Sequence, residues 1–553
     1  MSVEKLIVDH METWTSALQT RSTAGRGSSG KIDLYGIKKL RELILELAVR
    51  GKLVPQDPND EPASDLLKRI AAEKAELVKQ GKIKKQKPQP EISEEEKPFE
   101  LPEGWEWVHL PDIYCSISES SRKIKSSEIL PEGKYPVIEQ SQEFISGYCN
   151  NECLLIKLNN PVIVFGDHTR NIKFIDFDFV VGADGVKILS PILICERFFF
   201  WQLRSFKLDV RGYARHFKVL NSCLFALPPI AEQERIVEKV SSLMSLCDQL
   251  EQQSLTSLDA HQQLVETLLG TLTDSQNTAE LAENWARISE HFDTLFTTEA
   301  SVDALKQTIL QLAVMGKLVP QDPNDEPASE LLKRIAQEKA QLVKEGKIKK
   351  QKPLPPISDE EKPFELPEGW EWCRIGNIVN IKSELVSPKD YLNLYQVAPD
   401  IIEKGTGRVI SKRTVKESGV KGPNSRFYKG QIVYSKIRPS LSKVFLAEYN
   451  GLCSADMYPL DCYINPNYLL KYILSIPFLM QVKKAENRIK MPKLNSDSFY
   501  NIIVAIPPYN EQQAIFDKIN SIEAVCNGLI SYIGIYHKTQ LHLADALTDA
   551  AIN

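Results

Sequence analysis

The sequence predicts an α+β fold: two globular α/β domains separated by a long antiparallel two-helix coiled coil, related by a pseudo-twofold internal repeat. Three observations lead to this prediction: a 60-residue segment that occurs twice, two unrelated segments that each follow a copy of it, and two long heptad patterns. They divide the 553-residue chain into two halves, each of which is a fixed frame around a variable insert.

The repeat covers residues 48–107 and 313–372 at a constant offset of 265, and 52 of its 60 positions are identical. The inserts that follow look unrelated. Similarity returns at 227–236 (LPPIAEQERI) and 506–515 (IPPYNEQQAI), now at an offset of 279. A frame that is used twice indicates one kind of partner bound twice, whereas two different inserts indicate two different targets.

A long heptad pattern follows each Pro-Pro-x-x-Glu-Gln motif. In the second half, steps of four and three run from Ile515 to Leu547, and only Gln540 is strongly polar. In the first half the equivalent positions, 236–268, are apolar at both ends and polar in the middle, where His261 lies. Such steps predict a coiled-coil seam, and related halves predict antiparallel pairing. We interpret His261 as a structural seam residue, not as a catalytic base.

Each copy of the repeat predicts a short helical adaptor. Ser64 and Ser329 are the expected N-caps, and the apolar face of the first helix includes Leu66, Ile70 and Leu77. The sequence LPEGWEW then leads into each insert as a first strand or turn.

A basic run, KIKKQK, follows each adaptor helix, at residues 82–87 and again at 347–352. These lysines either touch phosphate or form solvated linkers. Because the two copies are identical there, they cannot distinguish two targets. At the N-terminus, residues 23–31 (TAGRGSSGK) are expected to form a flexible linker after a short helical arm.

Both inserts read as mixed α/β segments with short strands. PVIVF at 161–165 and FDFVV at 177–181 are strand candidates in the first insert, and QIVY at 431–434 is one in the second.

Each insert also carries two basic segments that we predict to contact nucleic acid. They are 166–173 (GDHTRNIK) and 211–220 (RGYARHFKVL) in the first insert, and 435–443 (SKIRPSLSK) and 487–493 (NRIKMPK) in the second. Basic loops with interspersed aromatic or hydroxyl residues suit phosphate positioning and base-edge readout. The predicted contact residues are Arg170, Lys173, Arg211, Tyr213, Arg215, Lys218, Lys436, Arg438, Lys443, Arg488, Lys490 and Lys493.

Charge is distributed unevenly along the chain. The net formal charge is −5, yet the second insert, from Cys373 to Ile506, carries 20 Lys and Arg against 10 Asp and Glu. The first insert, from His109 to Ile230, carries 14 against 13, so the frame is acidic. This pattern favours a protein that touches polyanions with its inserts only, and the alternative is a solvated charge bias without function.

Composition indicates a soluble protein of several domains. Hydrophobic residues make up 42% and charged residues 25%, and no apolar run is long enough for a membrane helix. Ten cysteines without a secretory signal predict reduced thiols in the cytoplasm. Cys149 and Cys153 have no second ligand pair at a zinc-site spacing, which favours free thiols over a metal site.

Catalytic motifs are missing from the sequence. It contains no G-x-x-x-x-G-K-[ST] and no Gly-rich turn suited to a nucleotide or adenosyl cofactor. Residues 506–509 (IPPY) resemble the Asn/Asp-Pro-Pro-Tyr/Phe motif of adenine methyltransferases, but isoleucine replaces the polar residue. Asp167, His168 and Asp184 offer an acid/base cluster without a convincing nucleophile. We therefore expect no cofactor, no metal and no catalysis in this chain.

The order of segments resembles the specificity subunit of type I restriction–modification enzymes. The segments DHTRNIKF, GYARHFK and SKIRPSLSKV also resemble motifs of its target-recognition domains. The expected division is an N-terminal arm and linker (1–35), frame copy 1 (36–107), recognition domain 1 (108–230), long helix 1 (231–270), a connector (271–300), frame copy 2 (301–372), recognition domain 2 (373–508) and long helix 2 (509–553).

The resemblance implies that each recognition domain reads one half of a bipartite site in double-stranded DNA, and that the coil sets the spacer. It implies that the frame docks two modification (methyltransferase) subunits and that two restriction (translocase/nuclease) subunits complete the complex. S-adenosylmethionine, ATP and Mg belong to those partners. The long N-terminal part departs from shorter family members and suggests that Met1–Trp107 completes the frame after Asn553.

Two other functions stay open from the sequence. One is a DNA-independent scaffold that bridges two copies of a protein partner, which strong salt dependence of DNA binding would exclude. The other is a self-sufficient methyltransferase or nuclease, which would give product from the lone chain with DNA and cofactors.

Overall fold

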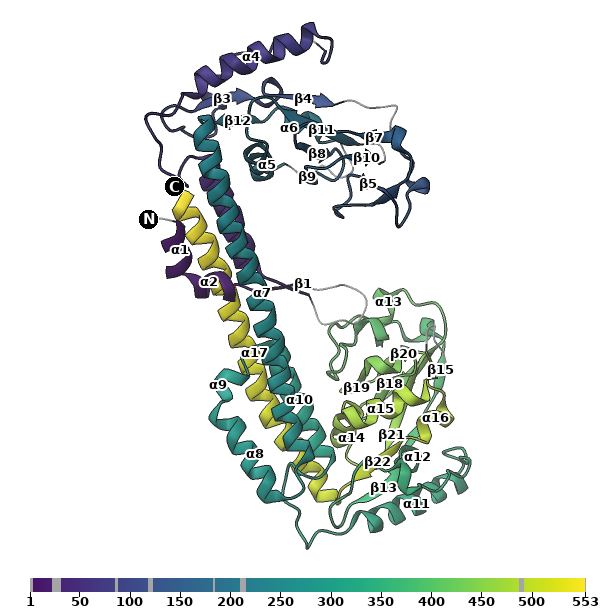
Figure 1. Ribbon diagram of the computed structural model, residues 1–553. Helices are drawn as coiled ribbons and strands as arrows, with labels where there is room; N and C mark the ends of the chain where they lie inside the picture. The colour runs from purple at the N-terminus through teal and green to yellow at the C-terminus, as the bar shows by residue number, and fades with distance from the viewer. Residues whose placement is uncertain are drawn as a thin grey trace. The chain divides into compact units, whose positions relative to one another are not determined.

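The structure is a computed structural model that describes residues 3–21, 31–84, 88–117, 123–182, 185–208, 215–486 and 492–552. It divides into unit 1, residues 1–257 and 536–553, and unit 2, residues 258–535. Each unit contains one frame copy, one insert and a part of both long helices, α7 (Ile230–Asp274) and α17 (Tyr509–Ile552) (Figure 1). The predicted fold class, two α/β domains with long helices in an internal repeat, is confirmed.

Unit 1 starts with the predicted helical arm, whose Trp14 is fully buried and donates from its indole nitrogen to the Leu6 carbonyl. The N- and C-terminal ends of the chain both belong to this unit (Figure 1). Its elements besides α7 and α17 are α1 (Val3–Asp9), α2 (Met11–Ser16), β1 (Gln19–Arg21), β2 (Lys31–Asp33), α3 (Tyr35–Val49), α4 (Ala63–Lys79), β3 (Glu106–His109), β4 (Tyr114–Ile117), β5 (Tyr135–Ile138), β6 (Gly147–Cys149), β7 (Leu155–Ile156), β8 (Val162–Gly166), β9 (Ile172–Ile175), β10 (Phe179–Val181), β11 (Val186–Pro191), α5 (Glu196–Ser205), α6 (Phe217–Asn221) and β12 (Leu224–Leu227).

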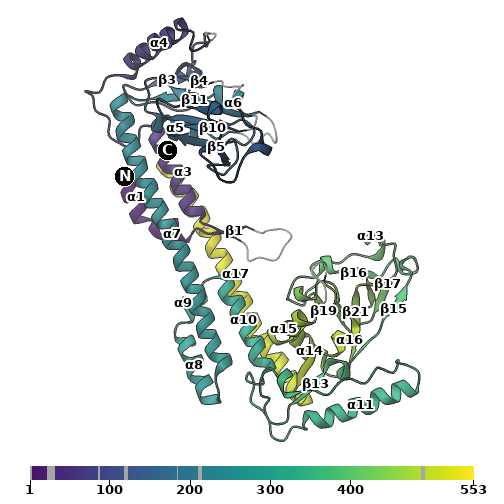
Figure 2. The same cartoon turned by 45° about the vertical axis from the view of Figure 1, so that its right-hand side comes forward.

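Unit 2 repeats this plan. In Figures 1 and 2, α8 lies alongside the C-terminal part of α7, and the two share a hydrophobic core with α10 and α17. Its elements are α8 (Thr278–Glu290), α9 (Phe292–Leu295), α10 (Glu299–Val314), α11 (Ala328–Lys344), β13 (Glu371–Arg374), α12 (Ile375–Ile378), β14 (Val379–Ile381), β15 (Glu384–Val386), β16 (Tyr395–Val397), α13 (Val415–Ser418), β17 (Asn424–Phe427), β18 (Ile432–Ser435), β19 (Val444–Leu446), β20 (Gly451–Ser454), β21 (Met457–Cys462), α14 (Pro466–Ile473), α15 (Ile476–Ala485), α16 (Ser496–Tyr500) and β22 (Ile503–Ile506).

The two inserts share the strand order of their first sheet and three strands of their second sheet, although their sequences look unrelated. The first has a sheet of order β4-β11-β8-β9 and the second a sheet of order β14-β21-β18-β19. A second sheet follows in each, in which β10 or β20 pairs parallel to one neighbour and antiparallel to the other. The fourth strand of the second sheet differs, because β6 pairs with β5 in the first insert and β15 pairs with β17 in the second. The central strands β8 and β18 are buried at every position, so an apolar pattern, not shared letters, specifies this fold.

The frame holds the two ends of each insert together. β3, from the repeated LPEGWEW segment, pairs antiparallel with β12, the last strand before the Pro-Pro motif. β13 and β22 form the equivalent pair in unit 2. The predicted first strand of each insert is therefore present, and it closes the insert against the start of a long helix.

The ends of the long helices meet in each unit, which makes the helices antiparallel. In unit 1, Lys52 Nζ donates to the Ile552 carbonyl at the end of α17 (2.6 Å), and Gln56 donates to Glu232 in the first turn of α7 (3.0 Å). In unit 2, Lys317 binds the Thr273 carbonyl near the end of α7 (2.9 Å). The N-terminal frame segment thus serves the end of α17 as its second copy serves the end of α7.

The predicted seam is correct at the start of each long helix and wrong farther along. Ile236 and Ile515 are fully buried, but Leu264 and Leu543 are about half exposed, and Val265 and Ala544 are buried in their place. Val265 lies 29 positions after Ile236, and 29 residues complete eight turns of a straight α-helix at about 3.6 residues per turn. A strict heptad pattern drifts by about 20° per heptad on such a helix, so the stripe moves by one residue.

The predicted N-caps of the adaptor helices are also wrong. α4 and α11 begin at Ala63 and Ala328, one residue before the serines, and Pro62 and Pro327 occupy the N-cap positions without a side-chain hydrogen bond. The Ala63 amide donates instead to the Gly104 carbonyl (2.9 Å). A backbone carbonyl of the frame therefore accepts a hydrogen bond from the N–H group at the helix start, so a serine side chain is not needed as a cap.

Candidate nucleic-acid interface

The two basic segments of the first insert lie together at Asp167, just after β8. The buried Asp167 carboxylate accepts from the Phe217 amide (2.8 Å), and its carbonyl accepts from the His216 amide (2.8 Å). The ring Nδ1 of His216 also lies 3.1 Å from that carbonyl. Asp167 and His216 thus have structural roles that join the turn after β8 to the segment before α6.

Arg215 and Lys218 flank this junction, and both side chains are exposed. They are free to meet a polyanion at the surface of the insert. Arg211 and Tyr213, the other predicted contacts in this segment, lie outside the described residues. Asp184, the third residue of the possible acid/base cluster with Asp167 and His168, also lies outside them.

Arg170 stands in the turn after β8 with a left-handed backbone, φ 62°. Positive φ is uncommon for residues other than glycine, and such strain is kept mostly where the surrounding structure and a function demand it. The Arg170 guanidinium donates to the Leu208 carbonyl (2.8 Å), and its other N–H groups have no hydrogen-bond partner among the residues that the structure describes.

Lys173 has a different environment from the other predicted contacts. Its side chain is buried, and its ammonium donates to the carbonyls of Glu139 (2.8 Å), Glu143 and Phe144 (3.4 Å). Desolvation lowers the pKa of this lysine. We therefore assign Lys173 a structural role in holding the loop of residues 139–144 and omit it from the proposed contacts.

Next to Arg170 lies a pocket of about 600 Å³ that combines aromatic and basic side chains. Phe174 and Phe200 pack edge to face at its wall, and Arg204 stacks over the Phe200 ring. Burial and the nearby Arg41 lower the pKa of Arg204. The sequence prediction missed Arg204 and α5, although ERFFFWQLRS at 196–205 carries the same mixture of arginine and aromatic residues.

The second insert brings its two basic segments together in the same way. Ile437 and Lys493 form an antiparallel bridge, the Arg438 amide donates to the Pro492 carbonyl (2.9 Å), and the Leu494 amide donates to the Lys436 carbonyl (2.8 Å). Arg438, like Arg170, follows the buried central strand with a left-handed backbone, φ 45°. The two inserts therefore present equivalent loops.

The predicted contact residues of these two segments differ in whether their side chains are already bound to other parts of the chain. Arg438 is exposed, whereas Lys436 donates to the Ala455 carbonyl (2.8 Å) and Lys493 pairs with Asp456 (3.3 Å). Lys443 donates to the Pro399 carbonyl. Arg488 and Lys490 lie outside the described residues.

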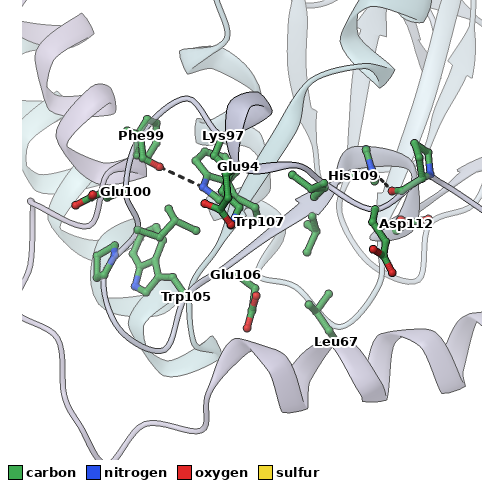
Figure 3. Close-up of a pocket in the computed structure, with 16 residues that line it drawn as sticks. Leu67, Glu94, Lys97, Phe99, Glu100, Trp105, Glu106, Trp107, His109 and Asp112 are labelled. Carbon is green, nitrogen blue, oxygen red and sulfur yellow. Dashed lines mark hydrogen bonds and ion pairs between the residues drawn. The ribbon is translucent and has the colours of Figure 1, made fainter.

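The frame differs chemically from these loops. A pocket of about 970 Å³ in frame copy 1 is lined by Trp105, Trp107 and five carboxylate side chains, and Lys97 is the only lysine among the described residues that line it (Figure 3). At one edge of this pocket, the Trp107 indole donates to the Phe99 carbonyl (3.3 Å). Leu67 of α4 faces the pocket from the other side (Figure 3). An acidic, aromatic pocket repels a polyanion and suits a protein partner.

Neither metal ligation nor disulfide chemistry is evident in the described part of the chain. It holds no group of three or more His, Cys, Asp or Glu side chains placed to bind a metal ion. All ten cysteines lie in described segments, and each is a free thiol. Among the described residues, no helix is long and apolar enough to cross a bilayer.

Comparison with known proteins decides the family. Residues 102–260 and 367–533 each match the type I restriction modification DNA specificity domain. The chain is 51% identical to the type I restriction enzyme EcoAI specificity subunit of Escherichia coli, over 100% of both chains. This chain belongs to the family of type I restriction enzyme specificity subunits. The EcoEI specificity subunit of Escherichia coli is 48% identical, again over 100% of both chains. A solved HsdS subunit from Thermoanaerobacter tengcongensis matches 83% of this chain and 98% of its own, with 16% identity and a TM-score of 0.38.

In this specificity subunit, each matched DNA specificity domain begins in the LPEGWEW segment and ends within a long helix. Each therefore contains one whole insert, with its paired basic segments, and the Glu-Gln motif that ties the insert to the frame. Gln233 accepts from the Cys195 amide (3.0 Å) in unit 1, and Gln512 accepts from the Asn465 amide (2.9 Å) in unit 2.

Proposed function

We propose that this chain is the DNA-reading subunit of a type I restriction–modification complex, in which each insert reads one half of a bipartite target. One observation carries the proposal: both inserts join two basic segments around an arginine with a left-handed backbone. Because the loop sequences differ while their placement agrees, each insert offers different side chains to base edges from an equivalent position.

The frame supplies the other half of the proposal, the docking of modification subunits. Its acidic pocket beside Trp105 and Trp107 favours a protein over DNA as occupant. Because 52 of 60 frame positions are identical, the same partner surface fits both copies, which supports two modification subunits per chain. Two restriction subunits complete the proposed complex. Methylation and cleavage, and the S-adenosylmethionine, ATP and Mg that they need, are assigned to these partners, and this chain is proposed to be non-catalytic.

Mapping of N6-methyladenine in cells tests this function directly. Cells that carry this chain with its modification subunits are compared with cells from which the gene for this chain is deleted. We expect a bipartite motif with a fixed gap that disappears on deletion. An unchanged methylation map, together with DNA binding that does not depend on sequence, would instead favour the scaffold that bridges two protein partners.

Exchange of the first insert for that of a relative sharpens the test. The new chain should methylate a hybrid motif in which only one half has changed. A change in both halves would contradict the assignment of one half-site to each insert.

A further inference from the structure

We infer that the lysine run of frame copy 2, residues 347–352, forms with the second insert a binding site for DNA backbone phosphates. This site is separate from the paired basic segments, and it rests on the proposed function because the phosphates belong to the DNA that the inserts read. It would extend the contact with DNA beyond the half-site without adding sequence preference.

The run does not extend freely into solvent. It lines a pocket of about 610 Å³ together with residues 380–383, at the end of β14, and with residues of α16. A phosphodiester group fits such a volume with water to spare. Residues of the frame and of the insert line this pocket together. The folded chain therefore places insert residues beside a lysine run whose sequence is the same in both frame copies.

Among the described residues, five lysines and one carboxylate, that of Asp497, line the pocket. The lysines are Lys347, Lys349, Lys350, Lys352 and Lys382. Lys352 pairs with Asp497 (3.3 Å) and Lys347 with Glu345 (2.8 Å). Lys349 and Lys350 are exposed and, among the residues that the structure describes, have no ion-pair partner. The excess of positive charge in one concave site is what attracts a phosphate.

Polar atoms support the same conclusion. The side-chain amide nitrogen of Gln351, another lining residue, is buried and makes no hydrogen bond of good geometry among the described residues, although the Gln351 side chain is near enough to the Tyr500 hydroxyl to lower the pKa of that phenol. A buried donor without a partner is costly, and a phosphate oxygen or a water bound to one would satisfy it. Ser383 and Ser496 add hydroxyl groups to the lining.

The pocket adjoins the loop that we propose reads bases. α16 starts at Ser496, two residues after Leu494, whose amide bonds to the Lys436 carbonyl. Both sites therefore share the stretch of chain from Pro492 to Tyr500. Lysine contacts to phosphate fix position and carry no sequence information, which agrees with a run that is identical in both halves.

The test compares K349Q/K350Q with a matched control, K333Q/K344Q, in the full chain assembled with its modification subunits. The control lysines are exposed on α11 and do not line the pocket. Affinity is measured at several salt concentrations for a duplex with the mapped target and for a duplex with that target scrambled. Each lost phosphate contact should lower the salt slope by about 0.9, so the double variant should lose about 1.8. Affinity for both duplexes should fall by the same factor.

Three outcomes would overturn the inference: an unchanged salt slope, an equal loss in the control, or a loss confined to the target duplex. Titration with tripolyphosphate distinguishes a second source of phosphate. If K349Q/K350Q abolishes tripolyphosphate binding but leaves the DNA slope intact, the pocket serves a free polyphosphate and the inference is wrong. Failure of the proposed function looks different, because the unsubstituted chain would then show no preference for any target.

Discussion

The indole nitrogen of Trp105 donates a 2.9 Å hydrogen bond to the carboxylate of Glu232, and Trp370 donates an equal bond to Glu511. In each unit this bond joins the LPEGWEW segment of the frame to the first turn of a long helix. The next residue, Gln233 in unit 1, holds the insert through the Cys195 amide. The repeated tryptophan and the Glu-Gln motif therefore form one clamp that fixes frame, insert and helix together.

We expect Trp105→Phe to lower the free energy of unfolding by about 1.5–3 kcal/mol, because the buried Glu232 carboxylate loses its indole donor. Denaturant unfolding of the whole chain measures the loss. Trp107→Phe is the matched control. Its indole bond to the Phe99 carbonyl is longer, at 3.3 Å, and only partly buried, so its removal should cost less. Equal losses in the two variants would contradict the clamp.

Burial raises the pKa of Glu232 above its ordinary value of 4.5, while the bonds from Trp105 and Gln56 oppose the rise. At lower pH, the carboxyl is protonated in both the folded and the unfolded chain. As pH rises through 4.5, the unfolded carboxyl ionises first, so this group costs stability that grows until the folded carboxyl ionises too. The stability of Glu232→Gln relative to the unsubstituted chain should therefore rise between pH 4 and pH 7, above a constant cost because the new amide NH2 faces one of the two donors, Trp105 or Gln56.

The unfolding midpoint, followed across that pH range, measures this rise. Glu234→Gln is the control, because Glu234 is an exposed neighbour on the same turn of α7. If both variants show the same pH profile, the effect does not come from the buried carboxyl. A relative stability that falls as pH rises would contradict the sign of the shift.

The repeat, the heptads and the strand candidates predicted the fold because local apolar pattern specifies helices and buried strands. The clamp was beyond such reasoning, since Trp105 and Glu232 lie 127 residues apart and no local pattern pairs them. The predicted seam failed at Leu264 for a related reason: a heptad pattern keeps one buried stripe only where helices supercoil, and α7 buries Val265 in place of Leu264.

The candidate site was likewise predictable only where local sequence pattern was enough. The basic character of the loops was visible in the sequence and led to the choice of Arg215 and Arg438, whose side chains are exposed and whose contact with DNA stays a prediction. What composition cannot tell is where each ammonium points. In the sequence, Lys173 resembles any other basic loop residue, yet in the fold its ammonium donates to three backbone carbonyls. The sequence prediction missed Arg204 because a segment rich in phenylalanine is usually interpreted as part of the hydrophobic core.

Lys173→Met tests that distinction. We expect a loss of about 1–3 kcal/mol in stability of the first insert, because three carbonyl acceptors lose their shared donor. The salt slope of DNA binding should stay unchanged. Lys218→Met, an exposed change on α6, should leave stability intact. A stable Lys173→Met variant with a smaller salt slope would restore Lys173 as a phosphate contact.

Arg215→Ala and Arg438→Ala should each impair the reading of one half-site, and different halves. Each arginine is exposed beside the junction of two basic segments, where a guanidinium can reach a base edge. If the contact is to a base, the substitution costs about 1–3 kcal/mol on the target duplex and little on duplexes altered in that half-site. Binding is measured on duplexes in which either half is scrambled. A uniform loss on every duplex would make these residues phosphate contacts, and a loss in the same half for both variants would contradict the division of labour between the inserts.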